Sequence, residues 1–175
     1  PVLCLSFAMP TPFYVLCSGL PRSGSTWSFT VCRLLMEALH GKDHVECGYH
    51  EGVNADRHVR RCRLSSSTHV IKLHYPTPTM IRFVLEGRAR NIYTMRHPLA
   101  AVASYREKFG GSVEDIATRM RQSLTTADRW TADRGTLRIE FEDIVNHTRG
   151  QIRRIAVHLG VGDVSEELVD SIDQE

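Results

Sequence analysis

The chain has 175 residues, of which 42% are hydrophobic and 24% charged, with a formal net charge of +2. This length and composition fit a single soluble domain over residues 1–175, and so small a net charge gives no reason to expect nucleic acid as a partner. The 5 cysteines include no Cys-x-x-Cys pair, so the sequence favours neither a zinc site nor a disulfide framework, and it favours a reducing cytoplasm.

The N-terminal segment carries no charged side chain before Arg22, but prolines interrupt it and no basic stretch precedes its apolar residues. We therefore expect no signal peptide, no membrane span and no membrane partner. Residues 1–12 are expected to be disordered or to be an addition to the native chain.

An apolar run over residues 13–17 predicts a buried strand, and residues 18–27 then read Ser-Gly-Leu-Pro-Arg-Ser-Gly-Ser-Thr-Trp. A glycine-bounded turn from a strand into a helix leaves backbone N–H groups pointing at one place, at the positive end of the helix dipole. This segment predicts a site for an anionic group. Gly19 and Gly24 have the spacing of a nucleotide-binding P-loop, but Ser25 stands where that loop has its lysine, and the nearest cation is Arg22.

Helix-like and strand-like patterns alternate along the rest of the chain. Apolar or β-branched runs predict further strands over residues 45–47, 68–73, 91–95 and 137–141. Helical spacing, capping residues and stop signals predict helices from the loop to Gly41, over residues 79–86, from Pro98, from Ser112, over residues 152–159 and from Ser165.

This alternation predicts an α/β fold of the P-loop nucleotide-binding type, with three layers: a parallel sheet of four to five strands and helices on both faces. Such sheets bind ligands at the carboxyl ends of their strands. Besides Arg22 in the first loop, Lys72 and His74 lie at one expected strand end, Arg96 follows another, and Ser104 lies in the next helix. Three separate strand ends therefore offer cationic or proton-transferring groups.

Four segments resemble the sulfotransferases that use 3′-phosphoadenosine 5′-phosphosulfate (PAPS). Residues 21–27, Pro-Arg-Ser-Gly-Ser-Thr-Trp, are similar to the phosphosulfate loop of that family, Pro-Lys/Arg-Ser-Gly-Thr-Thr-Trp. Residues 96–105 resemble its 3′-phosphate segment, in which an arginine and a serine stand eight residues apart. Residues 72–76, Lys-Leu-His-Tyr-Pro, are similar to the Lys-x-His-x-Pro of the cytosolic branch, and residues 141–143, Phe-Glu-Asp, to a late Tyr-Glu-Asp.

The resemblance implies an enzyme that moves a sulfuryl group from PAPS to a hydroxyl or amine by in-line displacement. The acceptor would be a small molecule or another hydroxyl-bearing compound, the product adenosine 3′,5′-bisphosphate (PAP), and no metal would be required. Arg22 and Lys72 would stabilise the charge on the bridging oxygen. The residues implied to bind the cofactor are Arg22, Ser23, Gly24, Ser25, Thr26, Trp27, Arg96 and Ser104.

His74 is the expected general base, because an imidazole with an ordinary pKa of about 6.5 accepts a proton at neutral pH. His50 and Glu51 are rival bases. Arg22, in place of lysine, resembles the Golgi and tyrosylprotein branch, whose base is a glutamate shortly after the first helix. The place of His74 at a strand end, two residues after Lys72, favours it over these rivals.

Nothing after Asp143 matches the basic glycine-rich segment that closes over the 3′-phosphate in cytosolic members of the family. Without that segment, the cofactor would be held by fewer contacts, by Arg149, Arg153 and Arg154, or by a partner chain in a homo-oligomer. Two other functions stay open. One is a P-loop kinase or nucleoside-triphosphate-binding protein, against which the absent lysine argues. The other is a module that binds PAPS or PAP without turnover.

Overall fold

Five parallel strands form the central sheet in the order β2-β3-β1-β4-β5. The computed structural model describes residues 13–62, 66–131 and 134–175, so the expectation for residues 1–12 lies outside the described residues. The strands are β1 (Phe13–Gly19), β2 (Val45–Tyr49), β3 (Thr68–Lys72), β4 (Ala89–Met95) and β5 (Thr136–Glu140). The predicted α/β fold with a parallel sheet is confirmed.

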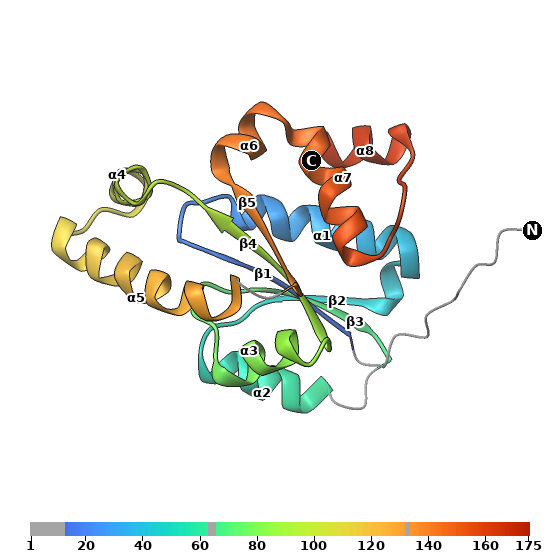
Figure 1. Cartoon of the computed structure of the whole chain (residues 1–175), viewed down its shortest axis with the longest axis horizontal. Helices are drawn as coiled ribbons and strands as arrows, with labels where there is room; N and C mark the ends of the chain where they lie inside the picture. The colour runs from blue at the N-terminus through green and yellow to red at the C-terminus, as the bar shows by residue number, and fades with distance from the viewer. Residues whose placement is uncertain (1–12, 63–65, 132–133) are drawn as a thin grey trace, which may run out of the picture.

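Helices cover both faces of the sheet (Figure 1). On one face lie α1 (Ser25–His40), α6 (Phe141–Asn146), α7 (Thr148–Leu159) and α8 (Glu166–Asp173). On the other lie α2 (Val53–Arg61), α3 (Pro78–Leu85) and part of α5 (Val113–Thr131), while α4 (Pro98–Phe109) stands beyond the carboxyl ends of the strands. A short 3₁₀ helix, Lys42–His44, precedes β2.

The last predicted strand, residues 137–141, needs a correction of one residue. The strand covers Thr136–Glu140, and Phe141 is the first residue of the short helix α6, which the sequence analysis did not predict. Glu140 is still extended, with φ of −78° and ψ of 144°. The Phe141 ring lies against the guanidinium of Arg96.

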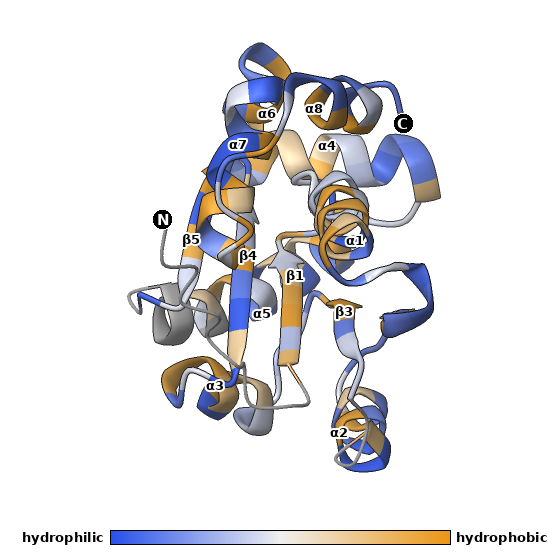
Figure 2. Ribbon diagram, turned by 90° about the vertical axis from the view of Figure 1, so that its right-hand side faces the viewer, coloured by the Kyte–Doolittle hydropathy of each residue, from blue (hydrophilic) through white to orange (hydrophobic). Residues whose placement is uncertain are grey.

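The central strand β1 explains why the sheet has two cores. All seven of its residues are buried, and alternate side chains point to opposite faces. Val15 and Cys17 pack with α1, α7 and α8, whereas Tyr14 and Leu16 pack with α2 and α3. Figure 2 shows the hydrophobic residues concentrated in β1 and α1. Within the described residues, no helix is long and apolar enough to cross a membrane.

β1 lies between β3 and β4, so the strand order reverses beside it. The chain leaves β1 toward α1 on one face of the sheet, and it leaves β3 toward α3 on the other face. A crevice at the carboxyl ends of the strands follows from this reversal, and it is the usual ligand site of such folds. The fold therefore brings together the loop after β1 and the residues that follow β3 and β4.

Candidate functional site

A cavity of about 490 Å³ lies at the carboxyl ends of β1, β3 and β4. Five of its lining residues are cationic and none carries a carboxylate. This charge distribution favours an anionic ligand with several negative groups. The cavity is lined by Pro21, Arg22, Gly24, Ser25, Thr26, Tyr49, Lys72, His74, Tyr75, Arg96, Tyr105, Lys108, Phe109, Arg119 and Phe141.

The loop after β1 turns into α1 within a few residues. Gly24 caps the helix in the left-handed conformation, with φ of 97°, and a Cβ there would lie 2.6 Å from Cδ1 of Ile144. Glycine is therefore needed at this position. No side chain caps α1 and its first turn holds no acidic residue, so its backbone N–H groups face the cavity without a carboxylate competing for them.

Arg22 has a backbone conformation that is rare for a residue other than glycine, with φ of 69°. Its Nε donates to Oγ of Ser104, at 3.2 Å, across to α4. Such unfavourable conformations persist where the surrounding structure holds them, and they cluster at binding sites. The turn thus places the Arg22 side chain in the cavity wall.

Arg96 lies beside Arg22, as the sequence predicts for the ends of neighbouring strands. Its Nη1 donates to the Arg22 carbonyl oxygen at 3.3 Å, and its guanidinium lies 4.0 Å from the Phe141 ring centroid. The Arg96 Nε is buried and has no hydrogen-bond partner among the described residues. A buried donor without a partner is costly, and an oxygen of a bound phosphate would satisfy it. The residues present therefore fit a phosphate-bearing ligand.

Ser104 hydrogen-bonds to Arg22, and no hydrogen bond joins it to Arg96 in the described part of the chain. The resemblance implied that Arg96 and Ser104 bind the same phosphate. In this structure Ser104 instead steadies the guanidinium of the phosphate loop, and its contact with a cofactor stays a prediction.

Lys72, the last residue of β3, reaches across to the start of α1. Its Nζ donates to Oγ1 of Thr26 at 2.7 Å and lies 5.4 Å from the Tyr49 ring centroid. Burial lowers the pKa of Lys72. The Lys72 ammonium group and the Thr26 hydroxyl therefore form one cluster of hydrogen-bond donors beside the loop after β1.

His74 lies in the cavity wall, just after β3. Its Nδ1 is 2.9 Å from the carbonyl oxygen of Gly19, so Nδ1 donates and Nε2 keeps its lone pair. Burial lowers the pKa of His74, which keeps the imidazole neutral at neutral pH. This is the protonation state that a general base needs.

The two rival bases are differently placed. The Glu51 carboxylate accepts the backbone N–H groups of His74, at 2.8 Å, and Tyr75, at 3.0 Å, and also the Tyr49 hydroxyl, at 2.9 Å. It holds the segment that carries His74. The His50 ring stacks on His58, with centroids 4.3 Å apart, and His50 does not line the cavity. Which residue is the base stays a prediction.

Three of the residues implied to contact the cofactor do not line the cavity: Ser104, described above, Ser23 and Trp27. Ser23 is fully buried, and its hydroxyl donates to the Leu20 carbonyl oxygen, at 2.6 Å, beside Oγ1 of Thr94. Trp27 is partly buried against the core between the sheet and α1. Their contacts with a cofactor stay predictions, and the aromatic ring that the structure places in the cavity beside Arg96 is Phe141.

Sequence reasoning missed the part of the cavity wall that α4 and α5 contribute. Tyr105, Lys108 and Phe109 come from α4, which buries only Ala101, and Arg119 comes from the amphipathic helix α5. The arginines proposed to replace the missing C-terminal segment lie elsewhere. Arg149 and Arg153 pair with carboxylates of α8, and neither lines the cavity.

A second cavity, of about 580 Å³, adjoins the first. Tyr75, Tyr105, Phe109 and Arg119 line both. The second cavity extends along α5 beneath the Gly110–Gly111 turn, and it is lined further by Gly110, Gly111, Asp115, Ile116, Thr118 and Gln122.

No family model matches the chain, and no curated protein matches it in sequence. Solved structures do match its fold. Retinol dehydratase in complex with androsterone and inactive cofactor PAP has a TM-score of 0.62 at 17% identity, over 95% of this chain and 65% of that one. Mouse sulfotransferase SULT7A1 complexed with PAP has a TM-score of 0.63 at 15% identity, over 93% and 62%.

A sulfotransferase domain from the Synechococcus PCC 7002 olefin synthase matches with a TM-score of 0.55 at 18% identity, over 91% of this chain and 76% of that one. The chain thus spans less than two thirds of the length of the first two proteins, which have 65% and 62% of their length covered. These likenesses confirm the expected fold.

Proposed function

We propose that this chain, which has the sulfotransferase fold, binds PAPS and transfers its sulfuryl group to a hydroxyl or amine of a small-molecule acceptor. One observation carries the proposal: five cations and the free imidazole nitrogen of His74 surround one cavity that no carboxylate lines. The crystal structures of retinol dehydratase and of the mouse sulfotransferase hold PAP, which supports this class of nucleotide.

In this proposal, two groups of donors in the cavity hold the two phosphates of the cofactor. At the first, the N–H groups of the α1 first turn and the Arg22 guanidinium would hold the 5′-phosphate. At the second, Arg96 would bind the 3′-phosphate through its unpaired Nε, stacked on Phe141. PAPS supplies the activated sulfuryl group when bound. The reaction then needs positioning and charge stabilisation, as phosphoryl transfer does.

The residues around the cavity have distinct roles in this proposal. Nε2 of His74 takes the proton of the acceptor hydroxyl, while the Gly19 carbonyl oxygen holds Nδ1 and stabilises the imidazolium that forms. Arg22 and Lys72 stabilise the negative charge that grows on the leaving oxygen. Glu51 orients His74 through the backbone.

The second cavity is the proposed acceptor site. It adjoins the first along Tyr75, and the rings of Tyr105 and Phe109 pack there in a tilted arrangement, with centroids 4.8 Å apart. Aromatic walls beside a basic residue suit an apolar acceptor with one polar group. The two retinol dehydratase structures hold androsterone and retinol, which supports acceptors of this kind.

A reducing cytoplasm is the proposed location of the protein.

The proposal is tested by incubating the protein with PAPS labelled in its sulfuryl group and a panel of phenols, steroid alcohols and amines. We expect label in at least one acceptor, and loss of that transfer in Arg22→Ala. The matched control is Arg33→Ala, whose arginine pairs with Glu37 on α1 and does not line the cavity. Binding of PAP without transfer to any acceptor would identify an inactive module, and phosphate transfer from ATP would identify a kinase.

A further inference from the structure

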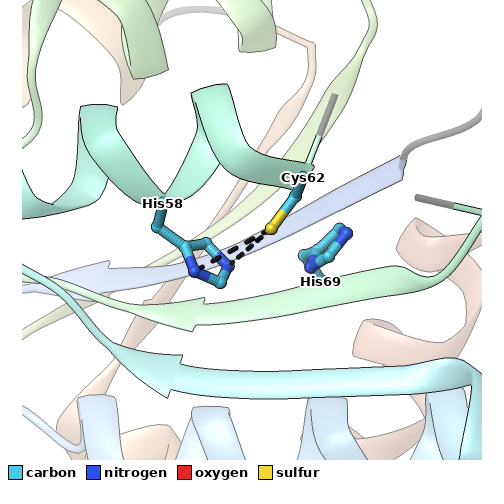
Figure 3. A group of neighbouring side chains, drawn as sticks. All are labelled: His58, Cys62 and His69. Carbon is cyan, nitrogen blue, oxygen red and sulfur yellow. Dashed lines mark hydrogen bonds between the residues drawn. The ribbon is translucent and has the colours of Figure 1, made fainter. Parts of the chain in front are cut away.

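Three metal-ligating side chains meet between α2 and β3, on the face of the sheet away from α1. His58 and Cys62 come from the end of α2 and His69 from β3, and one ligand atom from each lies within 4.8 Å of the other two. Figure 3 shows the three side chains facing one another. None of them lines the cavity described above.

Local structure accounts for the cluster. His58 and Cys62 are four residues apart at the end of one helix, so both project from the same face of α2. The Cys62 sulfur lies 3.6 Å from Nε2 of His58. His69 lies next to Thr68, the first residue of β3, and shares the sheet face of Ile71, which packs against Ala55 and Val59 of α2.

The His69 ring lacks the partners that a buried imidazole normally has. The residue is fully buried, and within the described residues neither ring nitrogen has a hydrogen-bond partner. Its flat face stacks on Tyr14, with centroids 5.3 Å apart, and its edge meets the His58 ring. Buried polar groups in proteins are almost always satisfied, so this ring requires an explanation. A bound cation would supply the missing interaction.

A fourth oxygen or nitrogen ligand is close by. Oε2 of Glu46, on β2, lies 3.6 Å from Nδ1 of His69, and half of the Glu46 side chain is exposed to solvent. The His50 ring stacks on His58 on the other side. The cluster therefore has a negatively charged neighbour and a route from solvent, as an ion-binding site needs.

We propose that His58, Cys62 and His69 bind Zn²⁺, with the Glu46 carboxylate as the fourth ligand. Zinc prefers imidazole and thiolate ligands in tetrahedral geometry, with metal distances of about 2.0 Å to nitrogen and 2.3 Å to sulfur, so neighbouring ligand atoms are roughly 3.3–3.6 Å apart. His58 and Cys62 already have that spacing. The ligand atom of His69 lies within 4.8 Å of the other two and would move closer to them when the ion binds.

Binding releases one proton to solvent, from the Cys62 thiol, because the thiolate is the ligand. The ion would join the end of α2 to the sheet, at the opposite end of β3 from Lys72. Its role would therefore be structural, and the inference does not depend on the proposed sulfuryl transfer. Sequence spacing does not suggest such a site, because its ligands belong to no Cys-x-x-Cys pattern and come from three elements.

The test is a zinc titration of the full chain, freed of metal by a chelator and then titrated in competition with a chromophoric chelator. We expect one Zn²⁺ per chain. His58→Ala and Cys62→Ser should each weaken zinc binding by more than about tenfold. Loss of a residue that only supports a metal ligand already costs about that factor. The matched controls are His40→Ala and Cys47→Ser, which change exposed residues and should bind zinc like the parent.

Two further measurements keep the outcome clear if a variant folds poorly. Zinc should raise the melting temperature of the parent and of the controls, but not that of His58→Ala, whose side chain is only partly buried. Cobalt should give a thiolate-to-metal charge-transfer band in the parent and in Cys47→Ser, and none in Cys62→Ser. Absence of one-to-one binding, or equal binding by ligand and control variants, would overturn the proposal. The affinity of the zinc-free chain for PAP tests the proposed sulfotransferase function separately.

Discussion

Nδ1 of His74 lies 2.9 Å from the carbonyl oxygen of Gly19, the last residue of β1. A carbonyl oxygen can only accept a hydrogen bond, so Nδ1 carries the hydrogen and Nε2 carries the lone pair. The end of one strand thus fixes the tautomer of a histidine that follows the neighbouring strand. The fold therefore gives the proposed base the tautomer that it needs, with the lone pair on Nε2.

His74→Ala should lower sulfuryl transfer by about 10²- to 10⁴-fold, the usual contribution of a general base, while PAP affinity stays near the parent value. Burial lowers the pKa of His74, so a lower pH is needed to protonate the imidazole. The parent rate should therefore hold from neutral pH to below about 6.5, the ordinary imidazole value, and fall only at lower pH. A rate that already falls above that pH would contradict the assignment.

Glu51→Gln is the companion variant. Its amide can accept only at one atom, so one of the N–H groups of His74 and Tyr75 loses its partner. We expect the free energy of unfolding to drop by about 1–3 kcal/mol and turnover to fall in part. Denaturant unfolding and steady-state kinetics measure both. An active His74→Ala together with an inactive, fully stable Glu51→Gln would make Glu51 the base.

Arg22→Ala should lower turnover by about 100- to 1,000-fold, which is the loss that follows removal of one donor to a developing oxyanion. The PAP dissociation constant should change much less, because the charge on the leaving oxygen grows mainly in the transition state. Lys72→Ala should behave in the same way. Calorimetry and initial rates give the two factors, and an equal loss in both would reduce Arg22 to a binding residue.

Arg96→Ala should remove the preference for PAP over AMP. The guanidinium stacks on Phe141 and has an unpaired buried Nε, so it is prepared for the 3′-phosphate that only PAP carries. Arg96→Lys should restore little, because an ammonium group cannot reproduce the stacked planar geometry. Isothermal titration of each variant with both nucleotides tests this, and an unchanged preference in Arg96→Ala would refute the role.

Phe109→Ala should raise the KM for the acceptor by about tenfold, since an aromatic contact of about 1.4 kcal/mol corresponds to that factor, and should raise the KM for PAPS by less. Phe109 lines both cavities. Leu99→Ala is the matched control, because Leu99 is exposed on α4 and lines neither cavity. If both variants raise the same KM, the second cavity is not the acceptor site.

Local patterns were enough to predict the sheet and the turn from β1 into α1. A buried strand, two glycines and a helical repeat specify β1, the turn and α1, and these depend on neighbours in sequence. The strand-end rule then brought Arg22, Lys72, His74 and Arg96 to one edge, and all four line one cavity. These residues follow from topology, which the alternation of elements already encodes.

Other features depend on tertiary packing that no local pattern records. Ser104 pairs with Arg22 and not with Arg96, because the position of α4 over the loop decides which guanidinium it meets. Arg119 lines the cavity from α5, an amphipathic helix whose sequence pattern does not indicate a binding site. The packing of α2 on β3 likewise decides that His69 meets Cys62.

The measurement that tests the central claim most directly is calorimetry of the full chain with PAP, compared with AMP and with ATP and Mg²⁺. In buffer without Mg²⁺, we expect one PAP per chain, tighter than AMP and tighter than ATP with Mg²⁺. The reason is that five cationic residues and no carboxylate line the cavity, which suits two phosphates and not a magnesium ion. Equal affinity for PAP and AMP, or tighter binding of ATP with Mg²⁺, would contradict the account.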